Sequence, residues 1–221
     1  MCGRYTIVTP APALAKRFNV KEAATPAPNY NAAPSQALPI ITNAAPGQIQ
    51  LVNWGLVPAW SRDPASGPKP INARAETLAE KPSFRQLLAR KRCLVLADSF
   101  YEWQDATGQG KTPHRILLKS EEPFAFAGLW DEWVDKASGE VHPTFTIITT
   151  DPNSLMANIH NRMPVILPGP EAEHAWLADD LSPAQHQQLL VPYDASQMRE
   201  YVISKRVNSP ANNDPQVLVA A

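Results

Sequence analysis

Proline is the residue that most constrains how this chain can fold. Among its 221 residues the chain has 23 prolines and only 9 glycines. Because proline fixes one backbone angle and has no amide hydrogen, prolines at this density divide a chain into short segments and disfavour long helices. The segments between them are rich in Val, Ile, Thr and Trp, which are frequent in strands. The sequence therefore predicts an α+β fold that is mainly β, with a few short helices.

Hydrophobic patterning gives the approximate positions of these elements. Strands are predicted at residues 4–8, 39–42, 49–54, 93–97, 114–118, 124–133 and 144–150. Short helices are predicted at residues 10–18, 83–90, 171–177 and 182–190, with Ser83 as a candidate N-cap, and a further helix is capped by residues 151–154 and runs through Ile159. Residues 25–34 are expected to form an extended, proline-stiffened loop. No repeat or linker divides the chain, so we predict one domain over residues 1–221, with a core from about residue 2 to residue 208 and a polar C-terminal tail.

Composition excludes several classes of protein. Hydrophobic residues make up 44% of the chain, which is enough for a folded core, and the net charge of −1 gives no overall affinity for nucleic acid. Any anion-binding surface must therefore be local. No apolar run follows Arg4 as in a signal peptide, and no window approaches a membrane span, so we expect a cytoplasmic protein without a membrane partner. The histidines are scattered and no CxxC or HExxH occurs, so we expect neither a metal nor another cofactor.

The chain has 2 cysteines, which is too few for a disulfide scaffold. Cys93 begins an apolar run and is predicted to be a buried core thiol. Cys2 follows Met1, so removal of Met1 would leave an α-amine and a thiol on adjacent carbons. Such an aminothiol condenses with an aldehyde to an imine, which the thiol then closes to a five-membered thiazolidine. The two groups have pKa values of about 8 and about 8.5 in model peptides, within reach of neutral pH. The alternative is that cysteine stands at position 2 by chance.

A carboxylate among aromatic residues is the second candidate feature. In the segment 100–103, strand alternation places Tyr101 and Trp103 on one face and Phe100 and Glu102 on the other. A carboxyl group at an apolar strand end has a raised pKa and can donate a proton at neutral pH. The alternative is an outward-facing glutamate on an edge strand.

Two further clusters combine polar groups at the ends of elements. His160 stands at the predicted end of a helix, where it is either a proton shuttle or a surface residue. Asn72 and Arg74 share a face of an extended segment, which suits an amide that orients a ligand and a guanidinium that holds an anion such as phosphate. The alternative for this pair is a cross-strand hydrogen bond and a surface charge.

The order of these segments resembles that of the SOS response-associated peptidase (SRAP) family, the abasic-site shielding proteins. The resemblance runs from Cys2 to about Pro168, with a weaker match at residues 201–208. It is carried by the segments 1–5 (Met-Cys-Gly-Arg-Tyr), 30–34 (Tyr-Asn-Ala-Ala-Pro), 54–60 (Trp-Gly-Leu-Val-Pro-Ala-Trp), 71–77 (Ile-Asn-Ala-Arg-Ala-Glu-Thr), 100–103 (Phe-Tyr-Glu-Trp) and 160–164 (His-Asn-Arg-Met-Pro). The chain departs from the family at Ser61, where many members have a second aromatic residue, and at Asp98-Ser99. The first departure implies weaker base stacking.

The resemblance implies a covalent mechanism on DNA. Met1 would be removed, by an associated self-peptidase activity or by an aminopeptidase, and the exposed Cys2 would form a thiazolidine with the ring-opened abasic site of single-stranded DNA. The implied catalytic residues are Cys2, Glu102 as the acid and base, His160 as a guide for proton transfers, and Asn72 as the group that positions Cys2 or the sugar. Implied DNA-binding residues are Arg4, Arg74 and Arg162 for phosphates, and Asn31, Pro34, Trp60 and Trp103 for bases. The expected protein is a monomeric, barrel-like SRAP domain that works without a cofactor and associates with the nucleoid through DNA.

Two rival functions remain open at this point. One is a cysteine peptidase that acts in trans, with Cys2 as the nucleophile and His160 as the base. The other is a single-stranded DNA-binding module without catalysis, in which Cys2 is incidental. The crosslinking hypothesis predicts that Cys2→Ala abolishes a covalent adduct but retains binding, whereas the binding-module hypothesis predicts full function without Cys2.

Overall fold

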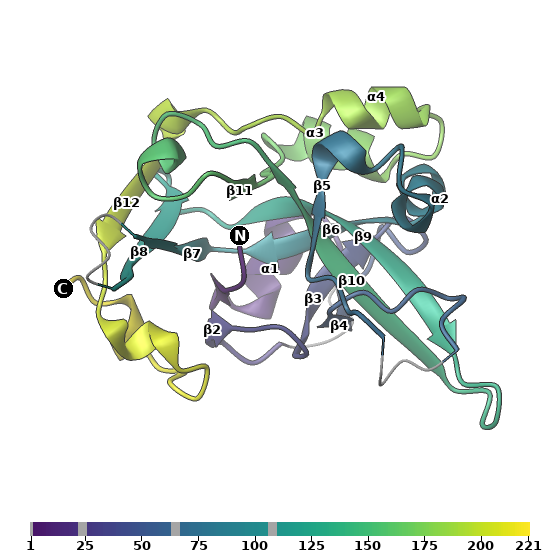
Figure 1. Cartoon of the computed structure of the whole chain (residues 1–221), viewed down its shortest axis with the longest axis horizontal. Helices are drawn as coiled ribbons and strands as arrows, with labels where there is room; N and C mark the ends of the chain where they lie inside the picture. The colour runs from purple at the N-terminus through teal and green to yellow at the C-terminus, as the bar shows by residue number, and fades with distance from the viewer. Residues whose placement is uncertain (1, 22–25, 63–66, 106–109) are drawn as a thin grey trace.

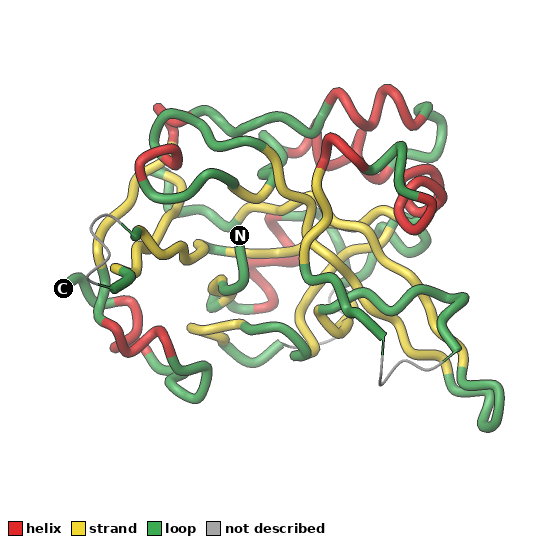
Figure 2. The backbone as a smooth tube through the Cα atoms, viewed as in Figure 1, coloured by secondary structure: helices red, strands yellow, loops and turns green. Residues whose placement is uncertain are grey.

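The computed structural model describes residues 2–21, 26–62, 67–105 and 110–221, and strands dominate it (Figures 1 and 2). The mainly β fold with short helices predicted above is confirmed. The strands are β1 (Tyr5–Ile7), β2 (Asn29–Ala32), β3 (Ala37–Thr42), β4 (Gln50–Trp54), β5 (Asn72–Arg74), β6 (Arg92–Ala97), β7 (Ser99–Gln104), β8 (Thr112–Leu118), β9 (Phe124–Val134), β10 (Val141–Thr150), β11 (Met163–Pro164) and β12 (Met198–Val202). The helices are α1 (Ala11–Arg17), α2 (Pro82–Arg90), α3 (Pro170–Leu177) and α4 (Pro183–Gln188), with 3-10 turns at η1 (Ala75–Thr77), η2 (Met156–Asn158), η3 (Ala195–Gln197), η4 (Lys205–Asn208) and η5 (Pro215–Leu218).

The predicted barrel is a closed ring of strands. Following the pairings around it, β10 pairs with β4, β4 with β3, β3 with β6, β6 with β9, and β9 returns to β10. Only the β10–β4 pairing in this ring is parallel. Because β10 is 10 residues long, it extends beyond the ring, and its last residues pair with β5 on one edge and β11 on the other. Because β5 pairs with this extension, its residues lie at the end of the ring where β10 continues beyond the other strands.

A second sheet, with strand order β12-β8-β7-β1-β2, is entirely antiparallel and lies beside the ring (Figure 1). The two sheets share one hydrophobic core. The fully buried Tyr5 ring from β1 packs against two aromatic rings of the barrel, with centroids 5.4 Å from Trp54 and 5.8 Å from Phe126. This contact fixes the first strand, and with it the N-terminal segment, against the ring.

Close packing inside the ring requires a glycine in β9. A Cβ atom at Gly128 would lie 2.8 Å from the Cys93 Sγ and 2.9 Å from a methyl group of Val95, both on β6. The Cys93 thiol is completely buried there, as predicted for a core residue. Any larger residue at position 128 would therefore push β6 and β9 apart.

Three local predictions were wrong. The strand β2 lies within the segment 25–34, because its backbone pairs with β1; residue 25 itself is outside the described residues. Ser83 is not the N-cap of α2, since Pro82 already occupies the first turn and Lys81 is the cap. The segment up to Ile159 forms only the 3-10 turn η2, which begins where the Asn153 side chain accepts the Met156 amide hydrogen at 2.9 Å.

The C-terminal segment packs against the second sheet. Val207 and Val217 are fully buried and form a small cluster with Tyr101 and Ile203, so the packed region extends beyond residue 208, where we expected a polar tail to begin. In Figure 1 this segment, in yellow, runs beside β8 and β12. None of the helices in the described part of the chain is long and apolar enough to cross a membrane.

Candidate active site

Cys2 lies immediately before β1, at the meeting point of the ring and the second sheet. Its side chain is completely buried, and its thiol donates a weak hydrogen bond to the Arg4 carbonyl at 3.8 Å. The Asn72 Nδ2 on β5 donates to the Cys2 carbonyl oxygen at 2.9 Å. Because β5 is held against β10 at the register Ile147–Asn72, the ring itself positions this amide. The hydrogen bond joins two candidate residues that are 70 positions apart in the sequence.

Glu102 is a buried carboxylate close to Cys2. The predicted alternation of β7 is confirmed, since Phe100 enters the main core while Tyr101 and Trp103 join the small C-terminal cluster. Glu102 is only 2% exposed. Burial raises the pKa of the Glu102 carboxyl above its ordinary value, and the charge of His160 acts on that pKa in the opposite direction. A carboxyl group in this environment stays protonated at a higher pH than usual and can act as a general acid.

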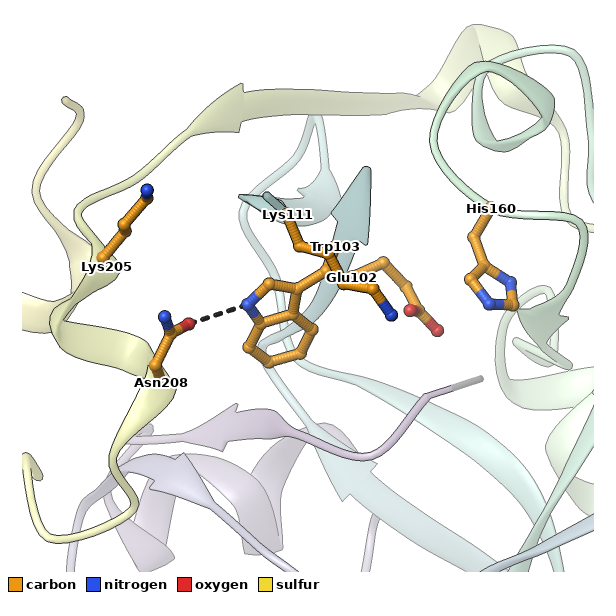
Figure 3. Close-up of a pocket in the computed structure, with 6 residues that line it drawn as sticks. All are labelled: Glu102, Trp103, Lys111, His160, Lys205 and Asn208. Atoms are coloured by element: carbon orange, nitrogen blue, oxygen red, sulfur yellow. Dashed lines mark hydrogen bonds between the residues drawn. The ribbon is translucent and has the colours of Figure 1, made fainter. Parts of the chain in front are cut away.

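His160 follows the turn η2, and a backbone contact determines which of its nitrogens carries the proton. Its Nδ1 accepts the Arg162 amide hydrogen at 3.0 Å. In the neutral ring the proton must therefore be on Nε2. Figure 3 shows the imidazole ring and the Glu102 carboxyl group on the same side of the pocket. The pair supplies one nitrogen donor and one carboxyl group for proton transfers at a bound ligand.

A pocket of about 530 Å³ opens beside these two residues. Its lining is polar and includes two lysines from distant parts of the chain: Glu102, Trp103, Lys111, His160, Lys205 and Asn208 (Figure 3). The Trp103 Nε1 donates to the Asn208 Oδ1 at 2.8 Å, which fixes the indole ring at the edge of the pocket. The sequence interpretation did not identify Lys111 or Lys205 as site residues. The only signal for Lys205 was its place in the segment 201–208.

The state of the thiol bears on the order of chemical steps. Burial raises the pKa of the Cys2 thiol, and the nearby Glu102 raises it further when its carboxyl group is ionised. The thiol is therefore protonated at neutral pH and is a poor first nucleophile. An α-amine on the same residue, once uncovered, would be the better first nucleophile, with the thiol reacting second.

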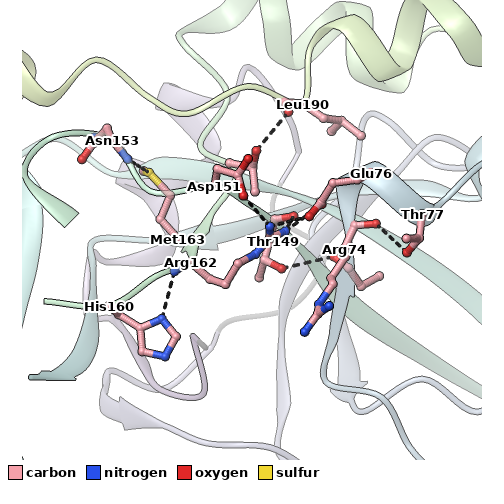
Figure 4. A network of polar contacts seen from close by, with 12 residues as sticks. Arg74, Glu76, Thr77, Thr149, Asp151, Asn153, His160, Arg162, Met163 and Leu190 are labelled. Carbon is pink, nitrogen blue, oxygen red and sulfur yellow. Dashed lines mark hydrogen bonds and ion pairs between the residues drawn. The ribbon is translucent and has the colours of Figure 1, made fainter. Parts of the chain in front are cut away.

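Arg74 and Arg162, both expected to bind phosphate, differ in their surroundings (Figure 4). The Arg162 side chain is buried and donates to both carboxylate oxygens of Glu76, to Asp151 at 2.9 Å and to the Thr149 carbonyl at 2.8 Å. These contacts commit Arg162 to the protein interior. Arg74 is exposed on β5, two residues from Asn72, and points away from this network. Only Arg74 of this pair is therefore positioned to meet a phosphate.

Arg4 and Asn31 hold the C-terminal segment instead of facing the pocket. The Arg4 Nη1 donates to the Asn31 Oδ1 and to the Val207 carbonyl, both at 2.8 Å. The fully buried Asn31 donates through Nδ2 to three carbonyls of that segment, at Val207, Ser209 and Asn212. Pro34, just after β2, is half-buried. The structure thus gives Arg4 and Asn31 a structural role that the sequence did not suggest.

Trp60 is 74% exposed and belongs to a different region of the surface. Its neighbours are tied to β9, because the Ala59 amide donates to Asp131 at 2.8 Å and the Ser61 carbonyl accepts from the Trp133 Nε1 at 2.8 Å. None of these residues lines the pocket beside Glu102. In the part of the chain that the structure describes, no group of three or more His, Cys, Asp or Glu side chains is arranged to hold a metal ion.

Comparisons with known proteins agree on one family. The model of the family described as SOS response associated peptidase (SRAP) matches residues 1–210. The chain is 47% identical to the abasic site processing protein YoqW of Bacillus subtilis, over 99% of both chains, and 34% identical to the abasic site processing protein HMCES of Gallus gallus, over 87% of this chain and 66% of that protein. A crystal structure of a protein from Bacteroides thetaiotaomicron superposes with a TM-score of 0.92 at 37% identity, over the whole of both chains.

Proposed function

The chain belongs to the SOS response associated peptidase (SRAP) family, and from this premise we propose that it processes abasic sites in DNA. The relatives named abasic site processing protein support this proposal. One observation supports assigning this function to particular residues. Cys2, the Asn72 amide that donates to its carbonyl, and the buried carboxyl group of Glu102 form one group.

The proposed reaction joins Cys2 to the abasic sugar through two new bonds. Glu102 donates a proton to the ring oxygen as the C1′–O4′ bond breaks, while the C1′ hydroxyl loses its proton, so the closed sugar becomes an aldehyde. The Cys2 amine attacks C1′, and the resulting hydroxyl leaves as water to give an imine. The thiol then adds to C1′ and its proton passes to nitrogen. One aldehyde and one aminothiol thus yield a thiazolidine and one water, with no oxidant or cofactor.

His160 and Asn72 have supporting roles in this proposal. The Nε2–H of His160 donates toward the hydroxyl that departs as water, since Nδ1 is occupied by the Arg162 amide. Asn72 holds the Cys2 carbonyl, so that the amine and the thiol point to one carbon. We also propose that Met1 is removed beforehand, by hydrolysis at this site or by an aminopeptidase; Met1 itself is outside the described residues.

Single-stranded DNA is the form of substrate that we propose, bound by a monomer. A pocket lined by Lys111, Lys205 and the fixed Trp103 ring combines cationic groups with a stacking surface, as single-strand sites do. Arg74 adds an exposed cation beside Asn72. We leave Arg4, Asn31 and Arg162 out of the proposed DNA contacts, because their polar groups bind the protein itself.

The experiment that tests this function uses the chain's two buried cysteines as a matched pair. The protein, Cys2→Ala and Cys93→Ala are each mixed with single-stranded DNA that carries one abasic site, and heat-stable adducts are resolved on a denaturing gel. We expect an adduct with the unaltered chain and with Cys93→Ala, and none with Cys2→Ala. A Cys2→Ala protein that forms the adduct, or an unaltered chain that forms none, would refute the proposal.

The same proteins, together with His160→Ala, test the peptidase alternative. Burial and the raised pKa of the Cys2 thiol disfavour attack on a peptide in trans. We therefore expect no cleavage of added peptides by the unaltered chain. Cleavage that requires Cys2 and His160, without adduct formation on DNA, would favour the peptidase instead.

A further inference from the structure

A second carboxylate–histidine pair lies on the sheet beside Glu102. In the antiparallel pairing of β7 with β8, Glu102 stands directly opposite His114. Residues that face each other in this way project from the same face of a sheet, with Cβ atoms about 4.5–5.5 Å apart. The next pair on the same face, two residues along each strand, is Phe100 and Ile116, and both enter the main core. His114 is therefore the neighbour of Glu102 on the side away from Cys2, which lies before β1.

His114 is connected to solvent through Glu200. The His114 side chain is only 8% exposed, and its Nδ1 lies 2.6 Å from the Glu200 Oε2 on β12. The Glu200 side chain is 34% exposed, so it meets bulk water at its outer side. The three side chains come from three adjacent strands, β7, β8 and β12, which are paired in this order in the sheet.

The other nitrogen of His114 has the property that a relay needs. A carboxylate can only accept from Nδ1–H, so the Glu200 contact assigns that nitrogen its hydrogen. Nε2 is buried and has no hydrogen-bond partner among the described residues. No contact therefore fixes whether Nε2 carries a proton, and it can both accept and release one. A buried ring nitrogen without a partner has a desolvation cost, so its presence on the face of an active-site acid calls for an explanation.

We propose that His114 and Glu200 form a proton relay that connects Glu102 to solvent while DNA covers the pocket. This inference rests on the proposed function. When the Cys2 amine starts as the ammonium ion, thiazolidine formation releases one water and one proton overall. That proton must leave a site whose open side is filled by the bound sugar. In the relay, the Glu102 carboxyl group turns to the His114 Nε2, which has no partner among the described residues of the resting structure, and gives it the proton. The Nδ1 proton passes to Glu200 and then to water. His114 is left with its hydrogen on Nε2, and one such transfer is enough for one adduct.

Two carboxylates face His114, and two further titratable groups stand on neighbouring segments. Glu102 faces it from β7 and Glu200 from β12, while His160 lies in the loop that follows η2 and Lys111 stands just before β8. Arg115 is on the opposite face, where it donates to the Tyr201 hydroxyl at 2.6 Å. His114 thus lies between two carboxyl groups on its own face of the sheet, the buried Glu102 on one side and the partly exposed Glu200 on the other. His114 and Glu200 are positioning residues, since neither touches the pocket.

The test compares two His–Glu pairs in one protein. His114→Gln, Glu200→Gln and the double variant remove the relay, and His142→Gln with Glu140→Gln removes a control pair whose atoms lie 3.7 Å apart on the β9–β10 hairpin. Single-turnover adduct formation on abasic single-stranded DNA is followed from acid to alkaline pH in H2O and D2O. Affinity for a tetrahydrofuran analogue, which has no aldehyde, and the melting temperature report on binding and folding.

We expect His114→Gln to slow adduct formation on the order of tenfold, less than the 10²–10⁴ of a direct acid or base, and to change the pH profile and the solvent isotope effect. We expect Glu200→Gln to change the pH profile and the solvent isotope effect in the same direction as His114→Gln. The double variant should be no slower than His114→Gln. Affinity for the analogue should be unchanged in all three variants. The control pair behaves as the unaltered chain.

Two results would overturn the relay while the proposed function stands: an unaltered pH profile in Glu200→Gln and His114→Gln, or a uniform slowing that follows a loss of melting temperature. If His114→Gln does not fold, Glu200→Gln alone decides, because its half-exposed side chain tolerates the change. Absence of an adduct with the unaltered chain would overturn the proposed function and the relay together.

Discussion

The hydrogen bond from Asn72 to the Cys2 carbonyl makes a quantitative prediction. Asn72→Ala removes the Nδ2 donor, which lies 2.9 Å from that carbonyl oxygen in a partly buried position. A carbonyl that loses its partner in such a position costs about 1–2 kcal/mol, toward the lower end of the range for buried groups. If this contact holds the N-terminus in its reactive geometry, the rate of adduct formation falls about 5- to 30-fold, at 1.36 kcal/mol per factor of ten.

The assay is single-turnover adduct formation on abasic single-stranded DNA, with the melting temperature measured in parallel. Asn72→Asp is the matched variant, because an ionised carboxylate has the same shape but cannot donate. We expect it to be at least as slow as Asn72→Ala at neutral pH, and to recover in part at acid pH, where a protonated carboxyl can donate. A rate within twofold of the unaltered chain for both variants, with both proteins folded, would refute the positioning role of Asn72.

Three further predictions follow from charge and burial. Glu102→Gln should lower the rate of adduct formation by about 10²–10⁴ and abolish the fall of that rate at alkaline pH. The reason is that burial raises the pKa of this acid, so its protonated form is lost only as pH rises through the raised value. A pH–rate profile that still falls at alkaline pH as in the unaltered chain would contradict this. The hydrogen bonds from Arg162 lower the pKa of Glu76, so this pair stabilises the fold above the ordinary carboxyl pKa of 4.5 and loses its effect as pH falls. Chemical denaturation should therefore show Glu76→Gln less stable by roughly 1 kcal/mol at neutral pH, since the carboxylate is half-exposed, and the difference should shrink in acid. Lys111→Ala and Lys205→Ala should each reduce the slope of log affinity against log salt by about 0.7, as for one phosphate of a single strand, and equal slopes would exclude them as phosphate contacts.

The parts of the site that depend on local pattern were predictable from the sequence. Alternation along β7 placed Phe100 and Tyr101 on opposite faces, and the structure confirms both positions. The family resemblance selected Cys2, Asn72, Glu102 and His160, and the structure brings these four together. Their association depends on β5 being attached to the end of β10, a long-range pairing that no local pattern encodes.

The arginines show why the remaining roles could not be predicted. A guanidinium in a sequence motif is equally suited to a phosphate or to a carboxylate of the protein, and only the fold decides between them. Glu76 and Asp151 occupy Arg162, and carbonyls of the C-terminal segment occupy Arg4. That segment was expected to be a polar tail because its apolar residues are few, yet Val217 is fully buried.

Long-range pairing also explains what the sequence did not reveal. Lys111 stands just before β8 and Lys205 begins the turn η4, and they share a pocket because η4 packs against β8. Likewise, His114 and Glu200 are 86 residues apart and meet through the pairing of β8 with β12. Neither pair forms a motif that could be recognised along the chain.

The use of both the amine and the thiol of Cys2 is the central claim, and tandem mass spectrometry of the crosslinked N-terminal peptide tests it most directly. The protein is reacted with abasic single-stranded DNA without a reducing agent, treated with a thiol-alkylating reagent and digested. We predict a peptide that begins at Cys2, carries the sugar with the loss of one water, and contains no alkylated thiol. A peptide that retains Met1, or one whose Cys2 is alkylated while it carries the sugar, would contradict the thiazolidine and the account built on it.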